Sequence, residues 1–408
     1  MSVLTPTLLT CVGITTAMHG VTYLLNTSLP LHVVALGGSL AQVGALFAVT
    51  TAISMILRPL VGGLVDRVGP RAIMLPGALV LVATALALSI ATTPSAFIVM
   101  MAGVGLSNGL VSTAGSIVVA AESPPARRGE ALSLYYVASS AGVALGPAAG
   151  LALAEIGGMT LTFAVVTALA VVIAGLVASL RTSRPAVRPV TALRLRLWSR
   201  HALPVAAALI LVTFGHGPVY AFLPLHAAAH GTGSVVWFFP LMSGFTVGCR
   251  LVLRRASDRI GRTRVLVPSM AGYALGYALL APPPSMPSLV AAALVLGAAT
   301  SMLYPTLVAL VADRTPEAER GLAIGTASAA WDLGVATGSA LIGVVVQATS
   351  YGVGFGTASV AAMLGLAAFV VTERFTILYL PDKRPLPASP TLAGNEGRSA
   401  RTSERSQP

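Results

Sequence analysis

The sequence predicts an all-α integral membrane protein, with twelve membrane-spanning helices in two pseudo-symmetric six-helix bundles and both termini in the cytoplasm. The first observation is composition: 55% of the 408 residues are hydrophobic and only 9% are charged, whereas about 25% of a soluble domain is charged. The second is that the charges are clustered between long apolar stretches, and the third is that the second half repeats the first. Together they exclude a soluble enzyme, a disordered protein and a disulfide-rich secreted protein.

Six stretches of the chain almost lack charged residues. They are residues 1–57, 72–121, 131–180, 201–249, 265–312 and 321–372. Each is roughly 50 residues long, and because one spanning helix needs about 20 apolar residues, each stretch holds two helices and a turn. Turn signals lie near the middle of the stretches, in order at residues 36–39, 92–95, 157–158, 231–233, 282–284 and 350–352. The six pairs give the twelve predicted helices.

All 25 lysines and arginines lie outside the six stretches. The positive-inside rule places such residues on the cytoplasmic side, so the net charge of +12 reflects membrane orientation, and nucleic-acid binding is not expected. The predicted domains are an N-terminal bundle at 1–180, a basic cytoplasmic linker at 181–203, a C-terminal bundle at 204–372 and a disordered cytoplasmic tail at 373–408. We expect a multi-pass protein of the cytoplasmic (inner) membrane.

The two halves of the chain are related by an offset of 192 residues. With this offset Arg58 corresponds to Arg250, and Gly142 corresponds to Gly334. Secondary transporters use such parallel repeats and bind their substrate between them, near the bilayer midplane. The repeat therefore favours transport over a receptor or a membrane enzyme.

The loop after the second predicted helix carries the most specific motif. Residues 62–71 read Gly-Gly-Leu-Val-Asp-Arg-Val-Gly-Pro-Arg, which resembles the signature loop of the major facilitator superfamily, Gly-x-Leu-x-Asp-Arg-x-Gly-Arg-Arg/Lys. The matching residues are Gly62, Asp66, Arg67, Gly69 and Arg71, with Asp258, Arg259 and Gly261 in the second copy, while Pro70 departs from the motif. The resemblance covers residues 1–372 and implies that family's transporter fold. It also favours a conformational latch at this loop, and the alternative is a set of solvated charges.

A second motif lies in the fifth predicted helix. Gly142, Gly146, Pro147 and Gly150 resemble the core of a motif associated with proton-coupled antiporters of the same family. Glycines four residues apart share one helix face and allow close helix packing, so a seam that bends during transport and plain packing both remain open. The family's arginine inside the fourth helix is absent, since residues 103–116 contain no basic residue.

Asp332 is the acid that the sequence places deep in the membrane. It follows Arg320 by about 18 Å of helix, which is near the midplane of a hydrocarbon core about 30 Å thick. Intramembrane carboxylates usually carry protons or face a cavity or a partner. Asp332 is therefore predicted to couple protons or to bind a cationic substrate, and the alternative is a neutral side chain hydrogen-bonded between helices. His19 and His216, at equivalent positions of the two halves, are further proton-coupling candidates or polar packing residues.

Four other polar residues are candidate substrate contacts. In the family the first, fourth, seventh and tenth helices line the cavity, and this resemblance selects Asn26, Asn108, Ser112 and Tyr304. The alternative for each is polar packing between helices. Glu155, at the outer end of its helix, is either a gate or an interfacial charge.

The predicted function is secondary active transport by alternating access, and the leading hypothesis is proton-coupled efflux of a drug or secondary metabolite. The alternative is an uptake symporter or facilitator for a sugar, an amino acid or an organic acid. The sequence shows no catalytic constellation, phosphate-binding loop or metal-ligand cluster, so we expect no enzymatic activity, cofactor or metal. The expected partners are a small-molecule substrate, protons and the lipid bilayer, and the protein is expected to be a monomer.

Overall fold

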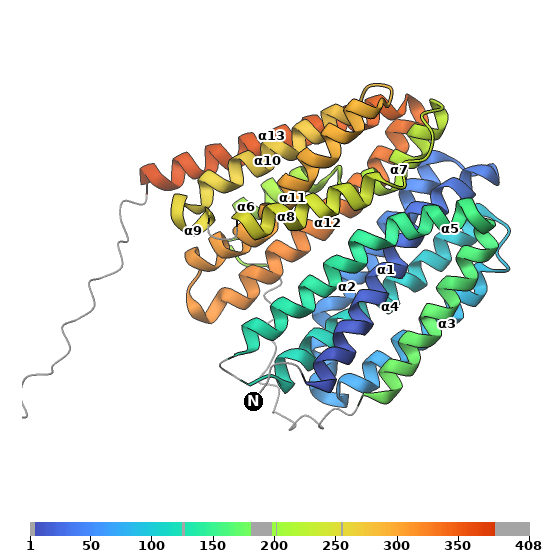
Figure 1. The fold of residues 1–408 in the computed structure, drawn as a ribbon. Coiled ribbons are helices and arrows are strands. Elements are labelled where there is room, and N and C mark those ends of the chain that lie inside the picture. The colour runs from blue at the N-terminus through green and yellow to red at the C-terminus, as the bar shows by residue number, and fades with distance from the viewer. Residues whose placement is uncertain (1–4, 125–126, 181–197, 201, 254–255, 380–408) are drawn as a thin grey trace, which may run out of the picture.

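The computed structural model describes residues 5–124, 127–180, 198–200, 202–253 and 256–379, and within these ranges it is helical without β-strands. The first half contains α1 (Pro6–Ala35), α2 (Leu40–Val68), α3 (Pro70–Leu88), α4 (Pro94–Glu122) and α5 (Arg128–Ser179). The second half contains α6 (Leu203–Thr213), α7 (His216–Ala229), α8 (Phe238–Leu253), α9 (Ala256–Ile260), α10 (Arg262–Leu280), α11 (Met286–Arg314), the short 3₁₀ helix η2 (Glu317–Glu319), α12 (Arg320–Ala348) and α13 (Tyr351–Tyr379). Figure 1 shows the two sets of helices as two bodies side by side.

The helices have the length and composition of membrane spans. Within the described ranges, nine helical segments are long and apolar enough to cross a membrane. The 52-residue α5 is interrupted at Gly157 and Gly158, where Gly158 has a φ of +65° and the backbone leaves the helical conformation. It therefore comprises two successive helical segments. The predicted all-helical membrane fold is confirmed, whereas the count of twelve spans stays a prediction.

Each of the four predicted domains includes residues outside the described ranges. They are residues 1–4 and 125–126 of the N-terminal bundle, 181–197 and 201 of the linker, 254–255 of the C-terminal bundle and 380–408 of the tail. The domain boundaries therefore stay predictions.

Local chemistry fixes where α2 and α3 begin. Ser39 caps α2, because its Oγ accepts from the Gln42 backbone N–H at 3.2 Å and Gln42 Oε1 accepts from the Ser39 N–H at 2.8 Å. α2 ends at Gly69, whose φ of +87° is available to glycine without a steric penalty. Pro70 then occupies the first position of α3, where its missing N–H has no helical partner to lose. The departure from the loop motif at residue 70 thus suits the start of a helix.

Each half packs mainly within itself. In the first half α1 packs on α5 and α2 packs on α4, while in the second half α10 and α11 pack on each other and α6 packs on α12 and α13. Glu373 ties three helices of the second half, accepting from Arg314 at 2.6 and 2.7 Å and from Thr263 Oγ1 at 2.8 Å. We call this contact the Glu373 clamp, and its carboxylate side chain is only 5% exposed.

The two halves meet mainly along α2 and α12. We call the end of the molecule where α1 begins the basic end, and the opposite end the charge-poor end. Near the charge-poor end the Leu40 N–H donates to Gln347 Oε1 at 2.6 Å. A Cβ atom on Gly44 would lie 3.0 Å from Gly343 Cα and still closer to the Ser339 carbonyl oxygen. We call this backbone-to-backbone contact of residues 40–44 with 339–347 the glycine seam.

Candidate functional site

An ion pair joins the two halves deep within the helices. Arg58 Nη1 on α2 donates to Asp332 Oδ2 on α12. The Asp332 side chain is 12% exposed, whereas the Arg58 side chain is 42% exposed. The sequence places Arg58 among the cytoplasmic charges between spans; the structure corrects this placement, because Arg58 lies inside α2 and its side chain reaches the other half.

Aromatic side chains of the second half lie next to this pair. The Trp331 ring centroid is 5.6 Å from that of Tyr304 and 5.2 Å from that of His216. Tyr304 Oη and Ser328 Oγ share a hydrogen bond of 2.6 Å. Ser328 lies one helical turn before Asp332 on the same face of α12. Of the four candidate substrate contacts, Tyr304 is thus placed in the surroundings of the acid.

The first half contributes aromatic rings to the same region. The Tyr23 ring lies edge-on to Tyr220 of the other half at 4.9 Å, and the Phe47 ring lies 6.3 Å from Tyr220. Tyr220 in turn contacts His216, whose ring lies against Trp331. Aromatic rings of both halves therefore form a continuous series of contacts that extends to the residue before Asp332.

The contacts between the halves close one end of the molecule. The glycine seam and the Tyr23–Tyr220 contact lie between the ion pair and the charge-poor end. Leu60 and Leu64 of α2, towards the basic end, are 61% and 43% exposed. The contacts that hold the two halves together thus include a set on the charge-poor side of the ion pair.

Neither candidate histidine bonds to Asp332. His19 is half-buried, and its Nδ1 donates to the Thr15 carbonyl oxygen at 2.9 Å, which leaves Nε2 without a proton in the neutral ring. His216 is buried, and its ring lies against Tyr220 at 5.3 Å and against Trp331. The structure therefore places His216 in the aromatic region beside Asp332 and gives His19 a local backbone partner.

The remaining substrate candidates are less accessible than Tyr304 or bond to each other. Ser112 Oγ donates to Asn108 Oδ1 at 2.8 Å within α4, and both side chains are half-buried. Asn26 is only 3% exposed, and its Oδ1 has no hydrogen-bond partner among the described residues. All of these substrate contacts stay predictions.

The latch residues lie at the basic end. Asp66, Arg67 and Arg71 are exposed, and Asp66 forms no ion pair with the residues that the structure describes. Gly69 and its repeat counterpart Gly261 have matching φ values of +87° and +96°. The two halves thus make the same turn at this loop, while the latch itself stays a prediction.

The glycine motif of α5 packs directly on the backbone of α1. A Cβ atom on Gly146 would stand 2.6 Å from the Gly20 carbonyl oxygen, and one on Gly150 would stand 2.5 Å from the Leu24 carbonyl oxygen. Gly142 faces α1 in the same way one turn earlier. These positions need glycine because any side chain would push the two helices apart.

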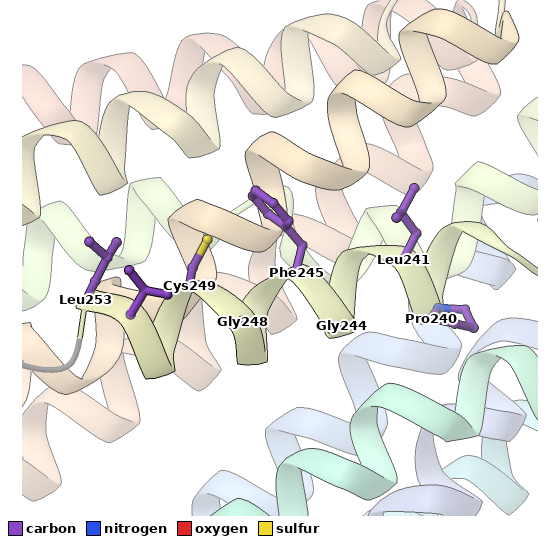
Figure 2. A pocket seen from close by; sticks show the side chains of 8 residues that line it. Pro240, Leu241, Gly244, Phe245, Gly248, Cys249 and Leu253 are labelled. Carbon is purple, nitrogen blue, oxygen red and sulfur yellow. The ribbon is translucent and has the colours of Figure 1, made fainter.

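Hollows open on the surface of the described residues, among them the following two. The first, of about 510 Å³, follows α8, and Figure 2 shows Leu241, Phe245 and Cys249 extending from the same side of that helix. Its lining is apolar or glycine, so it offers no charge to a ligand. The second, of about 390 Å³, lies where α1, α5 and α7 meet near the charge-poor end, and Glu155 is the charged residue in its lining.

Arg58 is the residue of this candidate site that the sequence did not place there. A signal was present, since the loop motif begins only at Gly62 and the preceding helix must continue past residue 58. The sequence alone does not reveal which residue pairs with Arg58, because Asp332 lies 274 residues further along the chain.

Comparison with known proteins identifies relatives along the whole chain. The sequence profile of the Major Facilitator Superfamily matches residues 11–255 and 237–406. An uncharacterized MFS-type transporter of Burkholderia pseudomallei is 29% identical over 345 residues, covering 81% of this chain and 83% of the relative. A staphylopine export protein of Staphylococcus aureus is 23% identical over 338 residues, covering 78% and 84%.

Solved structures share the fold. The nucleoside transporter NupG superposes with a TM-score of 0.74 at 15% identity, covering 91% of this chain and 100% of that one. The peptide transporter POT, in complex with sulfate, gives a TM-score of 0.74 at 16% identity, covering 90% and 94%.

Proposed function

The chain belongs to the major facilitator superfamily of membrane transporters, and we propose that it exports a small amphipathic organic molecule in exchange for protons. In this proposal the protein works as a monomer in the cytoplasmic membrane, by alternating access. The observation that carries the proposal is the ion pair of Arg58 and Asp332. A buried acid forms an ion pair between the two halves, so protonation of this one group can change the arrangement of the halves relative to each other.

Asp332 is the proton carrier in this scheme. When Asp332 is ionised, its attraction to Arg58 holds α2 and α12 together deep in the membrane, where an unpaired charge is costly. A proton on Asp332 removes the negative charge and weakens that hold. Because the glycine seam must also separate before the charge-poor end opens, the protonation state of Asp332 biases the exchange between the two arrangements.

The closed charge-poor end supports loading from the cytoplasm. The predicted orientation places the basic end inside the cell, so the substrate enters from the cytoplasm while the glycine seam is closed. Substrate and proton then act on the same ion pair in turn, which is the thermodynamic requirement for exchange. The export name of the S. aureus relative supports this direction.

The motif residues have defined parts in the cycle. We assign the latch to the arrangement in which the basic end is closed, where Asp66 and its neighbours would leave solvent and pair across the halves. The α5 glycines let α1 and α5 slide on a close contact without side chains in the way. His216, whose ring lies against Trp331, and His19, on the other half, remain the further proton-coupling candidates.

The test is proton movement driven by substrate. Inside-out membrane vesicles with an imposed pH gradient, reported by quenching of acridine orange, receive a panel of amphipathic antibiotics and dyes. We expect at least one compound to release protons through the wild-type protein, and Asp332→Asn to abolish that release. Proton release that persists in Asp332→Asn would exclude Asp332 as the proton carrier. Accumulation of the compound in vesicles with the pH gradient reversed would favour uptake over export.

Asp313→Asn is the matched control. It makes the same chemical change at an acid on α11 whose side chain is 59% exposed and which pairs with Arg262 at 3.2 Å. An exposed pair of this kind contributes at most about 1 kcal/mol, so the control protein should release protons as the wild type does. A loss in both variants would point to impaired insertion instead of lost coupling.

A further inference from the structure

The ion pair of Arg58 and Asp332 is not a requirement of the fold. The repeat places Arg250 on α8 where the first half has Arg58, and it places Ser140 on α5 where the second half has Asp332. Arg250 Nε donates to the Ser301 carbonyl oxygen at 3.3 Å and pairs with no carboxylate among the described residues, and Ser140 Oγ donates to the Tyr136 carbonyl oxygen at 2.9 Å. The repeat-related contact between the halves, of α5 with α8, thus forms without such an ion pair, so the pair calls for an explanation beyond stability.

The two members of the pair differ in accessibility. The Asp332 side chain is only 12% exposed, whereas the Arg58 side chain, at 42%, remains reachable by a ligand. A ligand with only a positive charge could take Asp332 but would leave Arg58, within the membrane-spanning helix α2, without a counter-ion. A ligand with only a negative charge would leave Asp332 in the same position. In either case an unpaired charge is left, at a considerable cost.

The surroundings suit a positive group beside Asp332. The Tyr304 hydroxyl group bonds to Ser328, which lies one helical turn before Asp332 on the same face of α12. Tyr304 is half-buried, and the Trp331 ring lies 5.6 Å from its ring. Faces of tryptophan and tyrosine attract ammonium groups through cation–π interactions. An aromatic wall next to a carboxylate therefore offers a cation two kinds of attraction at once.

We propose that the substrate is amphoteric, with a cationic group that replaces Arg58 at Asp332 and an anionic group that replaces Asp332 at Arg58. Without substrate, Arg58 and Asp332 neutralise each other. When the substrate binds, its two charged groups neutralise them instead, so neither side chain is left without a counter-ion. This inference rests on the transport function proposed above and names its substrate class. It also explains why the pair spans the two halves, because a substrate that separates Arg58 from Asp332 releases the tie between α2 and α12.

The test measures binding by the full-length purified protein, without a proton gradient. The probes are aromatic α-amino acids and dipeptides, each in four charge forms: the free zwitterion, its methyl ester, its N-acetyl acid and its N-acetyl methyl ester. Binding is first detected as thermal stabilisation of the protein. For the amino acid or dipeptide that stabilises it most, the affinities of all four charge forms are then measured by calorimetry, at a pH where the esters stay cationic. The proteins are the wild type, Arg58→Gln, Asp332→Asn and the double variant.

The preferred charge form should follow the charges that the protein retains. We expect the wild type to bind the zwitterion tightest, Arg58→Gln to prefer the methyl ester and Asp332→Asn to prefer the N-acetyl acid. The double variant should prefer the neutral form. Losing one charged partner should weaken zwitterion binding by about 10- to 100-fold.

Two results would overturn the proposal. One is that the order of charge forms is the same in all four proteins, which is the result expected if the pair only holds the halves together. The other is that no zwitterion of the series binds the wild type. Arg250→Gln is the control for loss of a membrane arginine, and it should keep the wild-type preference. Because binding needs no gradient, loss of charge preference is distinguishable from failure of proton coupling in the vesicle experiment.

Discussion

Replacing Gly44 with alanine should open the charge-poor end of the transporter. Gly44 lies in the glycine seam, where the backbones of α2 and α12 touch across the two halves. A Cβ atom there would stand 3.0 Å from Gly343 Cα and 3.3 Å from its nitrogen, whereas ordinary carbon contacts are about 3.5–4.0 Å. The obstacle is backbone on both sides, so no side chain can rotate away to make room.

The size of the effect follows from how far these distances fall below ordinary contact distances. Overpacking of a close contact costs about 1–3 kcal/mol. The seam exists only while the charge-poor end is closed, so this cost falls on the closed arrangement and not on the open one. The gain in helix propensity from glycine to alanine is common to both and cancels. The ratio of closed to open molecules should therefore fall by about 5- to 150-fold.

Spin-label distances across the charge-poor end would report this change. Ile90 and Met286, on opposite halves, are 81% and 59% exposed, so cysteines at both positions can carry labels. The two native cysteines, Cys11 and Cys249, are free and would be replaced by serine. Double electron–electron resonance in lipid nanodiscs measures the distance between the two labels. It should show one short distance for the parent protein, and a second, longer distance in addition for Gly44→Ala.

Gly63→Ala is the control, because it makes the same change on the same helix at a position with open space around the new methyl group. Its distance distribution should match that of the parent protein. An unaltered distribution in a well-folded Gly44→Ala protein would refute the reasoning, since it would show that the seam accommodates a methyl group without separating.

Three further predictions concern stability and the latch. Gly146→Ala places a methyl group 2.6 Å from a carbonyl oxygen of α1, so thermal denaturation should show a loss of about 1–3 kcal/mol, which Gly175→Ala, in open space on the same helix, should not show. Glu373→Gln leaves Arg314 of the Glu373 clamp without its carboxylate partner, and the free energy of unfolding should fall by about 3–5 kcal/mol because the pair is buried. A fall no larger than that caused by Asp313→Asn, in an exposed pair, would contradict this reasoning. Asp66→Asn should insert and melt as the wild type does but transport more slowly, and an unchanged initial rate would exclude the latch.

Local signals predicted the parts of the fold that depend on neighbouring residues. The scarcity of charge placed Asp332 inside a helix, and the structure finds it buried in α12. The paired glycines at 157–158 predicted a turn, and they interrupt α5. The spacing of four residues placed Gly142, Gly146 and Gly150 on one face, and all three face α1. Each of these inferences needs only helix periodicity and the cost of burying charge.

The parts that sequence reasoning missed depend on tertiary contacts. Arg58 ends an apolar stretch and has the composition of a cytoplasmic anchor, and only the approach of α2 to α12 turns it into the partner of Asp332. The break between α6 and α7 at Phe214 and Gly215 has two causes. Pro218 has no N–H to bond to the Phe214 carbonyl oxygen, and a Cβ on Gly215 would lie 2.6 Å from the Tyr277 ring, a contact that the sequence does not reveal. Asn26 shows the converse, since polarity alone does not reveal whether a residue faces a ligand or the interior.

The Glu373 clamp also sets how far the protein can be shortened for practical work. Its carboxylate comes from α13, the last helix that the structure describes, and it joins the start of α10 to the end of α11 through Thr263 and Arg314. A chain cut before residue 373 would lose this cross-link and leave Arg314 facing a vacated position. A chain that ends after Tyr379 retains it. For fusion of a fluorescent reporter or for crystallisation trials, the junction therefore belongs beyond residue 379.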